Sequence, residues 1–265
     1  LQNQQNRKRI YMSIDSLYTS LVRNAETKKS KGDFSELELL NIVARQKKVL
    51  LEINGIQYNI EIALKKLKTM MNFQDDFSIP DSTEIIAGEN QITEDNPLFN
   101  LIKLQINYYE ALLKIEKNKI LPDLSLNYFT GTNNYENARQ YNGFQVGLAV
   151  PLFFGSQKSK IESSKLSLNA QQLISENQII QLKSKIENLK KEELKYREAI
   201  QYYETSGRQL HDEILRATMR SYQLGEIDLF KFTSSYENAV QIKIDYLDNV
   251  LKYNENILEQ IYLEY

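Results

Sequence analysis

A helical pattern that runs without a break from about residue 157 to about residue 223 does most to limit the folds that this chain can adopt. Apolar residues recur there at alternating steps of three and four, the spacing of a coiled-coil seam. At 1.5 Å per residue such a helix is about 100 Å long, which exceeds the width of a compact domain. The pattern therefore predicts an elongated, mainly helical protein. Its seam comprises Leu182, Ile186, Leu189, Tyr196, Ile200, Tyr203, Leu210, Ile214 and Ala217, with Glu193 and Gly207 as irregular members.

The composition agrees with long helices and excludes several classes of function. The 265 residues include nine Gly and four Pro, so few positions force a helix to end. The formal net charge is −2, and Lys and Arg are mixed with Asp and Glu, so there is no basic face for a nucleic-acid partner. Because Cys is absent, disulfides, thiolate metal ligands and cysteine nucleophiles are excluded.

Periodicity and turn residues divide the chain into four predicted segments. In order, they are a helical hairpin, a connection with a short helix, a β-hairpin, and a second helical hairpin that runs to Tyr265. Their predicted boundaries are 1–72, 73–120, 121–155 and 156–265. In the first hairpin, the returning helix has a predicted seam of Leu39, Val43, Leu50, Ile53, Ile60, Leu64, Leu67 and Met71, interrupted by Gln46 and Gln57. In the last helix, the predicted seam is Leu229, Phe232, Tyr236, Ala239, Tyr246, Val250, Tyr253 and Ile257, broken by Lys243.

The third segment changes the apolar period from about 3.6 to 2, which predicts two strands. One face has the large apolar residues Leu124, Leu126, Tyr128, Phe144, Val146, Leu148 and Val150. The other face has Ser125, Asn127, Gln145, Gly147 and Ala149. No run of about 18 apolar residues predicts a membrane helix, whereas a membrane strand needs only about 9 to 11 residues. A soluble hairpin with one buried face would show the same alternation, so the strands alone leave both environments open.

The two helical hairpins align at a constant offset of 193 residues without a gap. The offset places Leu39 on Phe232 and Ile60 on Tyr253, and it places GDFS at 32–35 on GEID at 225–228. Because the turns and the seams agree at one offset, we interpret the chain as an internal duplication. Since the chain starts within a polar helical pattern, we expect the natural protein to carry a second strand pair and the rest of a helix before Leu1.

Several local motifs, in this order, resemble those of the outer-membrane efflux, or TolC-like, family. KNKILPDLSL at 117–126 and GLAVPLFFG at 147–155 resemble its strands and the start of its long helix. KGDFSELELL at 31–40 and LGEIDLFKF at 224–232 resemble its hairpin tips, where a small polar residue follows a Gly by three positions.

The resemblance implies a mainly α-helical fold in which long coiled-coil hairpins form an α-barrel and a β-hairpin contributes to a transmembrane β-barrel. It implies a homotrimer in the outer membrane of a Gram-negative bacterium, with most of the chain in the periplasm. The partners would be a periplasmic adaptor, an inner-membrane pump and outer-membrane lipid, which would contact the apolar face of the strands. The expected function is passive export of small molecules or metal ions. The alternatives are a duct for type I protein secretion and a structural coiled-coil scaffold with a soluble hairpin.

The two hairpin tips are the predicted binding sites for the adaptor. They comprise Gly32, Asp33, Phe34 and Ser35, and Gly225, Glu226, Ile227 and Asp228. A Gly that permits positive φ and a residue that caps the returning helix are also explained by turn chemistry alone. Large apolar residues between them, which we expect to be exposed, suit a protein contact. Acids at Asp33, Glu36, Glu38, Glu226 and Asp228 would form a ring in a trimer that favours cations.

No catalytic, metal or cofactor site is predicted. His211 is the only histidine, so neither a multi-histidine metal site nor a serine triad can form, and we expect it to be solvated. Glu192 and Glu193 lie on a helix rich in Lys, which indicates ion pairs rather than acid–base catalysis.

Overall fold

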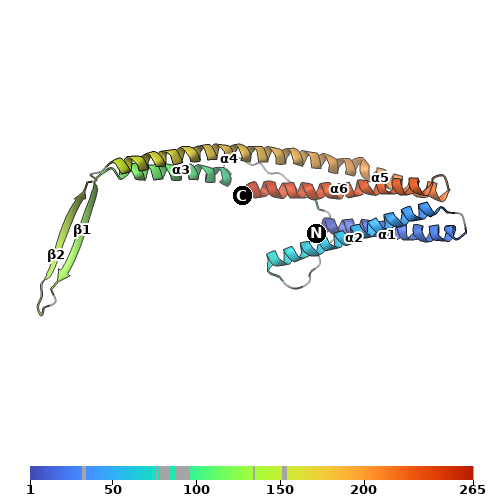
Figure 1. Cartoon of the computed structure of the whole chain (residues 1–265), viewed down its shortest axis with the longest axis horizontal. Coiled ribbons are helices and arrows are strands. Elements are labelled where there is room, and N and C mark those ends of the chain that lie inside the picture. Colours follow the sequence, from blue (N-terminus) through green and yellow to red (C-terminus); the bar gives the residue numbers. More distant parts are fainter. Residues whose placement is uncertain are drawn as a thin grey trace. The chain divides into compact units, whose positions relative to one another are not determined.

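The computed structural model describes residues 1–31, 34–73, 75, 77, 84–87, 96–133, 135–150 and 154–264, and within these it contains six α-helices, one π-helix and two strands (Figure 1). The elements in order are α1 (Gln2–Lys29), α2 (Glu36–Met71), α3 (Pro97–Asn118), β1 (Asp123–Thr132), β2 (Gln140–Ala149), α4 (Phe154–Tyr202), the π-helix η1 (Tyr203–Gly207), α5 (Arg208–Gln223) and α6 (Leu229–Glu264). The predicted helices and strands are confirmed. No helix in the described ranges is both long enough and apolar enough to cross a membrane.

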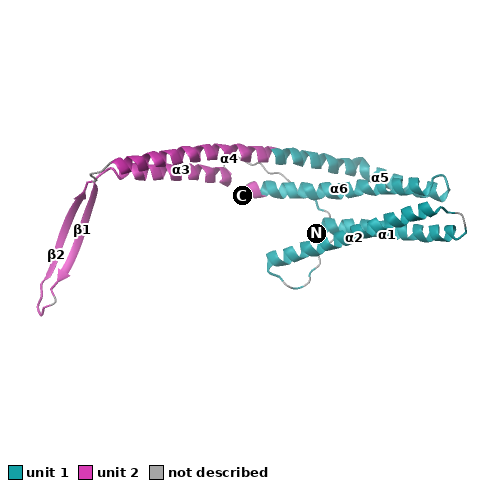
Figure 2. Cartoon of the chain, in the orientation of Figure 1, with its two compact units in different colours: residues 1–89, 188–261 teal, residues 90–187, 262–265 magenta. Residues whose placement is uncertain are grey.

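The chain forms two compact units, which Figure 2 distinguishes by colour. Unit 1 comprises Leu1–Glu89 and Asn188–Ile261, and unit 2 comprises Asn90–Glu187 and Tyr262–Tyr265. Unit 1 therefore holds both hairpin tips, and unit 2 holds the strands. The four segments predicted from the sequence remain a prediction.

In unit 1, α1, α2 and α6 share one apolar core. Buried residues of α1 such as Tyr18 pack with Ile42 of α2 and Phe232 of α6. A polar contact crosses this core, because the Tyr18 hydroxyl donates to Glu237 Oε1 at 2.6 Å and Arg45 donates to the other carboxylate oxygen at 2.5 Å. Burial raises the pKa of Tyr18 above its usual value, and the bond to Glu237 adds to the rise. The two helical hairpins are thus joined by both packing and charge.

The predicted seam of α2 is correct in part. The buried residues are Ile42, Val49, Ile56 and Ile60, of which only Ile60 was predicted. The predicted Leu39 and Ile53 are half-buried and pack against the core, whereas Leu50 is exposed. Apolar residues occupy a wide arc of α2, and α1 covers only part of it. The period was correct because it depends on spacing, whereas the seam position depends on where the neighbouring helix lies.

The long helix also departs from its predicted seam, at the π-helix η1. Ile200 and Tyr203 are buried as predicted, but beyond η1 the buried residues are His211 and Thr218, and Leu210 is exposed. A π-turn adds one residue to the helix, so every later position moves to a different face. His211 was expected to be solvated, and this expectation is wrong: it is 8% exposed, and its Nδ1 lies 2.7 Å from the Ala239 carbonyl oxygen.

The duplication also explains this burial. The offset of 193 residues places Ile14 on Gly207, Tyr18 on His211 and Ala25 on Thr218, and all six are buried. The repeat was therefore the sequence signal that could have located His211 in the core.

In unit 2, α3 lies beside the first part of α4. Gln157 Nε2 donates to the Glu116 carbonyl oxygen at 2.7 Å and to its carboxylate at 2.8 Å. Hydrogen bonds from Lys119 and Gln157 lower the pKa of the Glu116 carboxyl. Asn96 begins α3 by accepting the Leu98 N–H at 2.8 Å, which satisfies one free donor of the first turn.

Candidate functional site

The strand register gathers the predicted apolar residues onto one face of the hairpin. β1 and β2 pair antiparallel, with Leu124 opposite Leu148, Leu126 opposite Val146, and Tyr128 opposite Phe144. Because side chains alternate along a strand, these three pairs share a face. The register thus confirms the prediction that these residues lie on one face of the hairpin.

This apolar face lies open within the described chain. The exposed fractions of its seven predicted members run from 52% at Val150 to 76% at Leu124. An isolated two-stranded hairpin is marginal in water, and one with a fully exposed apolar face lacks the burial that normally stabilises a sheet. The hairpin therefore requires an apolar environment or a partner for this face.

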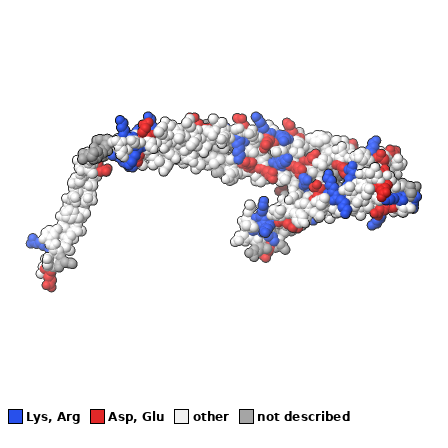
Figure 3. All heavy atoms as spheres, viewed as in Figure 1, with Lys and Arg blue, Asp and Glu red and all other residues white. Residues whose placement is uncertain are grey.

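An aromatic pair and then a polar pair end the apolar face toward the connecting loop. The rings of Tyr128 and Phe144 lie 5.0 Å apart, and the next pair on the same face is Thr130 with Asn142. Between Asp123 and the loop neither strand has a charged residue, and Figure 3 shows an uncharged band there between charged groups at both ends. Membrane strands show this order of apolar band and aromatic girdle.

The opposite face is small and polar over the same length. Ser125 lies opposite Gly147, and a Cβ on Gly147 would lie 2.6 Å from the Ser125 hydroxyl oxygen. Toward the loop, Phe129 lies over Gly143, where a Cβ would lie 2.5 Å from its ring. The sequence reasoning did not single out Phe129. Its placement is that of an aromatic ring covering a strand glycine, and the glycine opposite it in register was the available signal.

The α5–α6 tip is closed by a Schellman motif. Glu226 N–H donates to the Ser221 carbonyl oxygen at 2.9 Å and Gly225 N–H donates to that of Tyr222 at 3.1 Å, with Gly225 at φ 74°. Asp228 then caps α6, since its carboxylate accepts the Lys231 N–H at 2.7 Å. Both the positive φ and the cap agree with the prediction.

The α1–α2 tip is described in part, because Gly32 and Asp33 lie outside the described residues. Ser35 has the extended backbone of a helix N-cap, at φ −71° and ψ 139°, but its side chain makes no capping hydrogen bond. Glu36, one of the predicted ring acids, pairs with Lys29 at 3.2 Å. In the other tip the Glu226 carboxylate accepts the Ser221 hydroxyl at 2.8 Å. These acids therefore have local partners.

The expected exposure of Phe34 and Ile227 is corrected by the structure. Both are half-buried and pack against the apolar core of unit 1. The exposed apolar residues of the tips are instead Leu37, Leu40, Leu224 and Phe230. They were not predicted, because Leu40 and Phe230 lie beside seam positions and Leu37 and Leu224 lie at helix ends. The sequence signal for these exposed residues was the presence of large apolar side chains near the tips at positions outside the seam.

The described residues contain no group of three or more His, Cys, Asp or Glu side chains placed to hold a metal ion. Glu193 pairs with Arg197 and accepts a hydrogen bond from Gln260 at 3.0 Å, so its role is the expected ion-pair surface.

Comparison with known proteins gives the fold. The sequence matches no protein-family model and no curated protein. The structure resembles the Campylobacter jejuni CmeC outer membrane channel, with 17% identity and a TM-score of 0.76 over 99% of this chain and 59% of that one. It resembles the outer membrane protein VceC of Vibrio cholerae, with 13% identity and a TM-score of 0.83 over 98% and 66%.

A third similar structure is the open state of the Neisseria gonorrhoeae MtrE outer membrane channel, with 15% identity and a TM-score of 0.64 over 97% of this chain and 63% of that one. The chain thus spans about three fifths to two thirds of the length of these proteins. It has the fold of TolC-like outer-membrane channels, as the sequence motifs predicted.

Proposed function

We propose that this chain, which has the fold of outer-membrane channels, forms the periplasmic and membrane-spanning parts of one protomer of a trimeric export duct. The duct carries small molecules or metal ions passively from the periplasm to the exterior. It works with an inner-membrane pump and a periplasmic adaptor, and it has no catalytic role of its own. The observation that carries the proposal is the hairpin, whose register gathers six exposed apolar side chains on one face.

The membrane assignment follows from this face and from the closure of the sheet. Apolar side chains opposite one another would meet lipid, while Ser125, Asn127 and Gln145 would face a watery lumen. In lipid an unpaired strand edge leaves its N–H and C=O groups without partners. Two strands cannot close a sheet, so the second strand pair expected before Leu1 and the strands of other copies would supply its neighbours.

Exposed apolar residues on the helices support assembly of several copies. Leu104 and Tyr108 of α3 are exposed, as are Leu173 and Ile180 of α4. Contiguous exposed apolar surface marks a protein contact. We assign these faces to neighbouring copies in a homotrimer, the assembly that the family resemblance implies.

The tips supply the contact with the adaptor. Leu37 and Leu224 are apolar and exposed, and both lie within one turn of a hairpin tip. Charged and polar side chains such as Glu36 and Glu226 surround them, which is the composition of a protein interface. The acidic ring remains part of this proposal as a filter that favours cations at the mouth of the duct.

Two substitutions on β2 test the membrane assignment. Leu148→Asp places a charge on the proposed lipid face, where it costs up to a few kcal/mol, and Gln145→Asp places the same charge on the lumen face. We expect Leu148→Asp to abolish recovery of the natural protein in the outer-membrane fraction, and Gln145→Asp to leave it near the wild-type level. Equal recovery of the two variants would contradict the assignment. The scaffold alternative predicts that even the wild-type protein fractionates as a soluble rod.

A further inference from the structure

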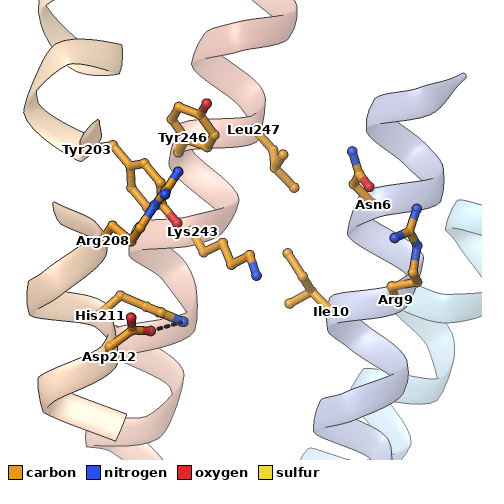
Figure 4. Close-up of a pocket in the computed structure, with 10 residues that line it drawn as sticks. All are labelled: Asn6, Arg9, Ile10, Tyr203, Arg208, His211, Asp212, Lys243, Tyr246 and Leu247. Carbon is orange, nitrogen blue, oxygen red and sulfur yellow. Dashed lines mark ion pairs between the residues drawn. The ribbon is translucent and has the colours of Figure 1, made fainter. Parts of the chain in front are cut away.

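A cavity of about 520 Å³ lies within unit 1, between α1, α5 and α6 (Figure 4). Its walls include Tyr203, Arg208 and His211 from the η1–α5 segment, and Lys243 and Tyr246 from α6. Its volume falls in the range of small-molecule sites in proteins. Neither the tips nor the strands use any of these residues, so the cavity is separate from the proposed export function.

The cavity lies where the apolar seam of α6 is interrupted. Lys243 occupies a position of that seam, and it lines the cavity. On the opposite wall, the π-helix η1 contributes Tyr203, and α5 contributes Arg208 and His211. A charged residue therefore stands where a regular coiled coil would place an apolar side chain.

The rim of the cavity is cationic. Arg9, Arg208 and Lys243 line it, against one acid, Asp212. In the part of the chain that the structure describes, neither Arg208 nor Lys243 forms an ion pair. Figure 4 shows the Lys243 side chain extending from α6 toward α1, across the cavity. Its ammonium group is thus directed into the space that a ligand would occupy.

The inner wall is aromatic, with Tyr203 buried and Tyr246 half-buried. The rings of Tyr203 and Tyr246 stack with centroids 4.1 Å apart, and the Arg208 guanidinium lies 5.9 Å from the centroid of Tyr203. The cation–π contact with Tyr203 restrains the Arg208 side chain, which reduces the entropy that Arg208 loses when it binds an anion. His211 is held by its bond to Ala239, with its Nε2 3.9 Å from the Asp212 carboxylate.

We propose that this cavity binds a small molecule through an oxyanion group, a carboxylate or a phosphate, with Lys243 and Arg208 as its charge partners. Guanidinium and ammonium groups form charge-assisted hydrogen bonds with such oxygens. Asp212 opposes the anion and limits affinity. Because Arg208 and Lys243 are exposed, binding weakens as ionic strength rises.

His211 provides a reporter inside the cavity, and its resonance in the natural protein is the one that His211→Gln removes. The natural protein, labelled with ¹³C at the histidine Cε1, is titrated with sodium phosphate and separately with sodium benzoate, at fixed pH and fixed ionic strength. We expect the His211 resonance to shift and saturate with at least one of the two anions. Choline chloride, a cation of similar size to benzoate, should produce no saturating shift.

Substitutions then separate a site from a general salt effect. Lys243→Met should weaken anion binding about tenfold, the effect of losing one charge-assisted hydrogen bond. Lys252→Met removes the same charge from an exposed position on the same helix and should leave affinity unchanged. Asp212→Asn should tighten binding, because it removes the opposing acid. Circular dichroism confirms that each variant is folded.

The proposal is overturned if neither anion saturates, or if Lys243→Met and Lys252→Met give the same titration. It is also overturned if Asp212→Asn weakens binding. Failure of the membrane assignment would not affect these results, since the cavity lies within one compact unit of a single chain.

Discussion

Gly225 and Gly55 differ in backbone conformation, so replacing each with Ala should have opposite effects on the stability of the protein. Gly225 has φ 74° at the C-terminus of α5, whereas Gly55 lies exposed inside α2, where an added Cβ would have no neighbour within 4 Å. We expect Gly225→Ala to destabilise the protein by about 1 kcal/mol, because L-residues disfavour left-handed backbone. Gly55→Ala should stabilise it by about 0.5 to 1 kcal/mol, because Ala is the better helix former.

Urea unfolding of the purified protein, followed by circular dichroism, measures both changes. A Gly225→Ala variant at least as stable as the wild type would show that Gly225 is not needed for the turn.

Single residues also show which faces and which burial states could be predicted from the sequence and which could not. Because side chains alternate along a strand, the face on which each strand residue lies could be predicted from its position in the alternation. The pairing of Leu126 with Val146 agrees with that prediction. The burial of His211 was missed, because a π-turn changes the face of all later residues, whereas helical periodicity assumes a constant rotation per residue. Phe34 and Ile227 were expected to be exposed because they lie in turns, but a turn can fold its side chains back onto the core.

At the scale of elements, lengths and types were predictable, and contacts were not. The ends of α2 and α6 agree with the predicted hairpins within a few residues, since few Gly and Pro residues compete as stop signals. The seam of α2 was predicted only in part, because its apolar residues form a wide arc that faces more than one neighbour. Part of that arc, including Leu51 and Tyr58, is exposed in the single chain.

The tips are the element at which docking can be tested. Acidic substitutions at Phe34 and Ile227 would disturb the core that these residues touch, so they cannot separate docking from folding. We instead expect Leu37→Asp combined with Leu224→Asp to abolish export in the host while leaving the amount of protein in the outer membrane unchanged. Both side chains are exposed, so their loss removes an interface anchor with little effect on stability.

Met70→Asp is the matched control, because it removes another exposed apolar side chain of α2 far from the tip. Normal export by the double variant, or equal loss in the control, would contradict docking through the tips.

At the scale of the whole molecule, the duplication and the order of the motifs led to the fold, and the TM-scores of 0.76 and 0.83 against two outer-membrane proteins confirm it. The environment of the strands was open from their pattern alone, because a half-buried soluble sheet and a membrane sheet alternate in the same way. The structure adds that no described part of the chain covers the apolar face.

The central claim, that one face of the hairpin meets lipid and the other a watery lumen, is tested most directly by the environments of neighbouring residues in β1. Once any Cys of the natural protein outside these 265 residues is replaced by Ser, Leu126→Cys and Asn127→Cys each introduce one site for a nitroxide spin label. In the natural protein reconstituted in lipid, the label at position 126 should collide preferentially with oxygen, which concentrates in the bilayer. The label at position 127 should collide preferentially with a water-soluble nickel chelate. Equal access of the nickel chelate to both positions would contradict the account.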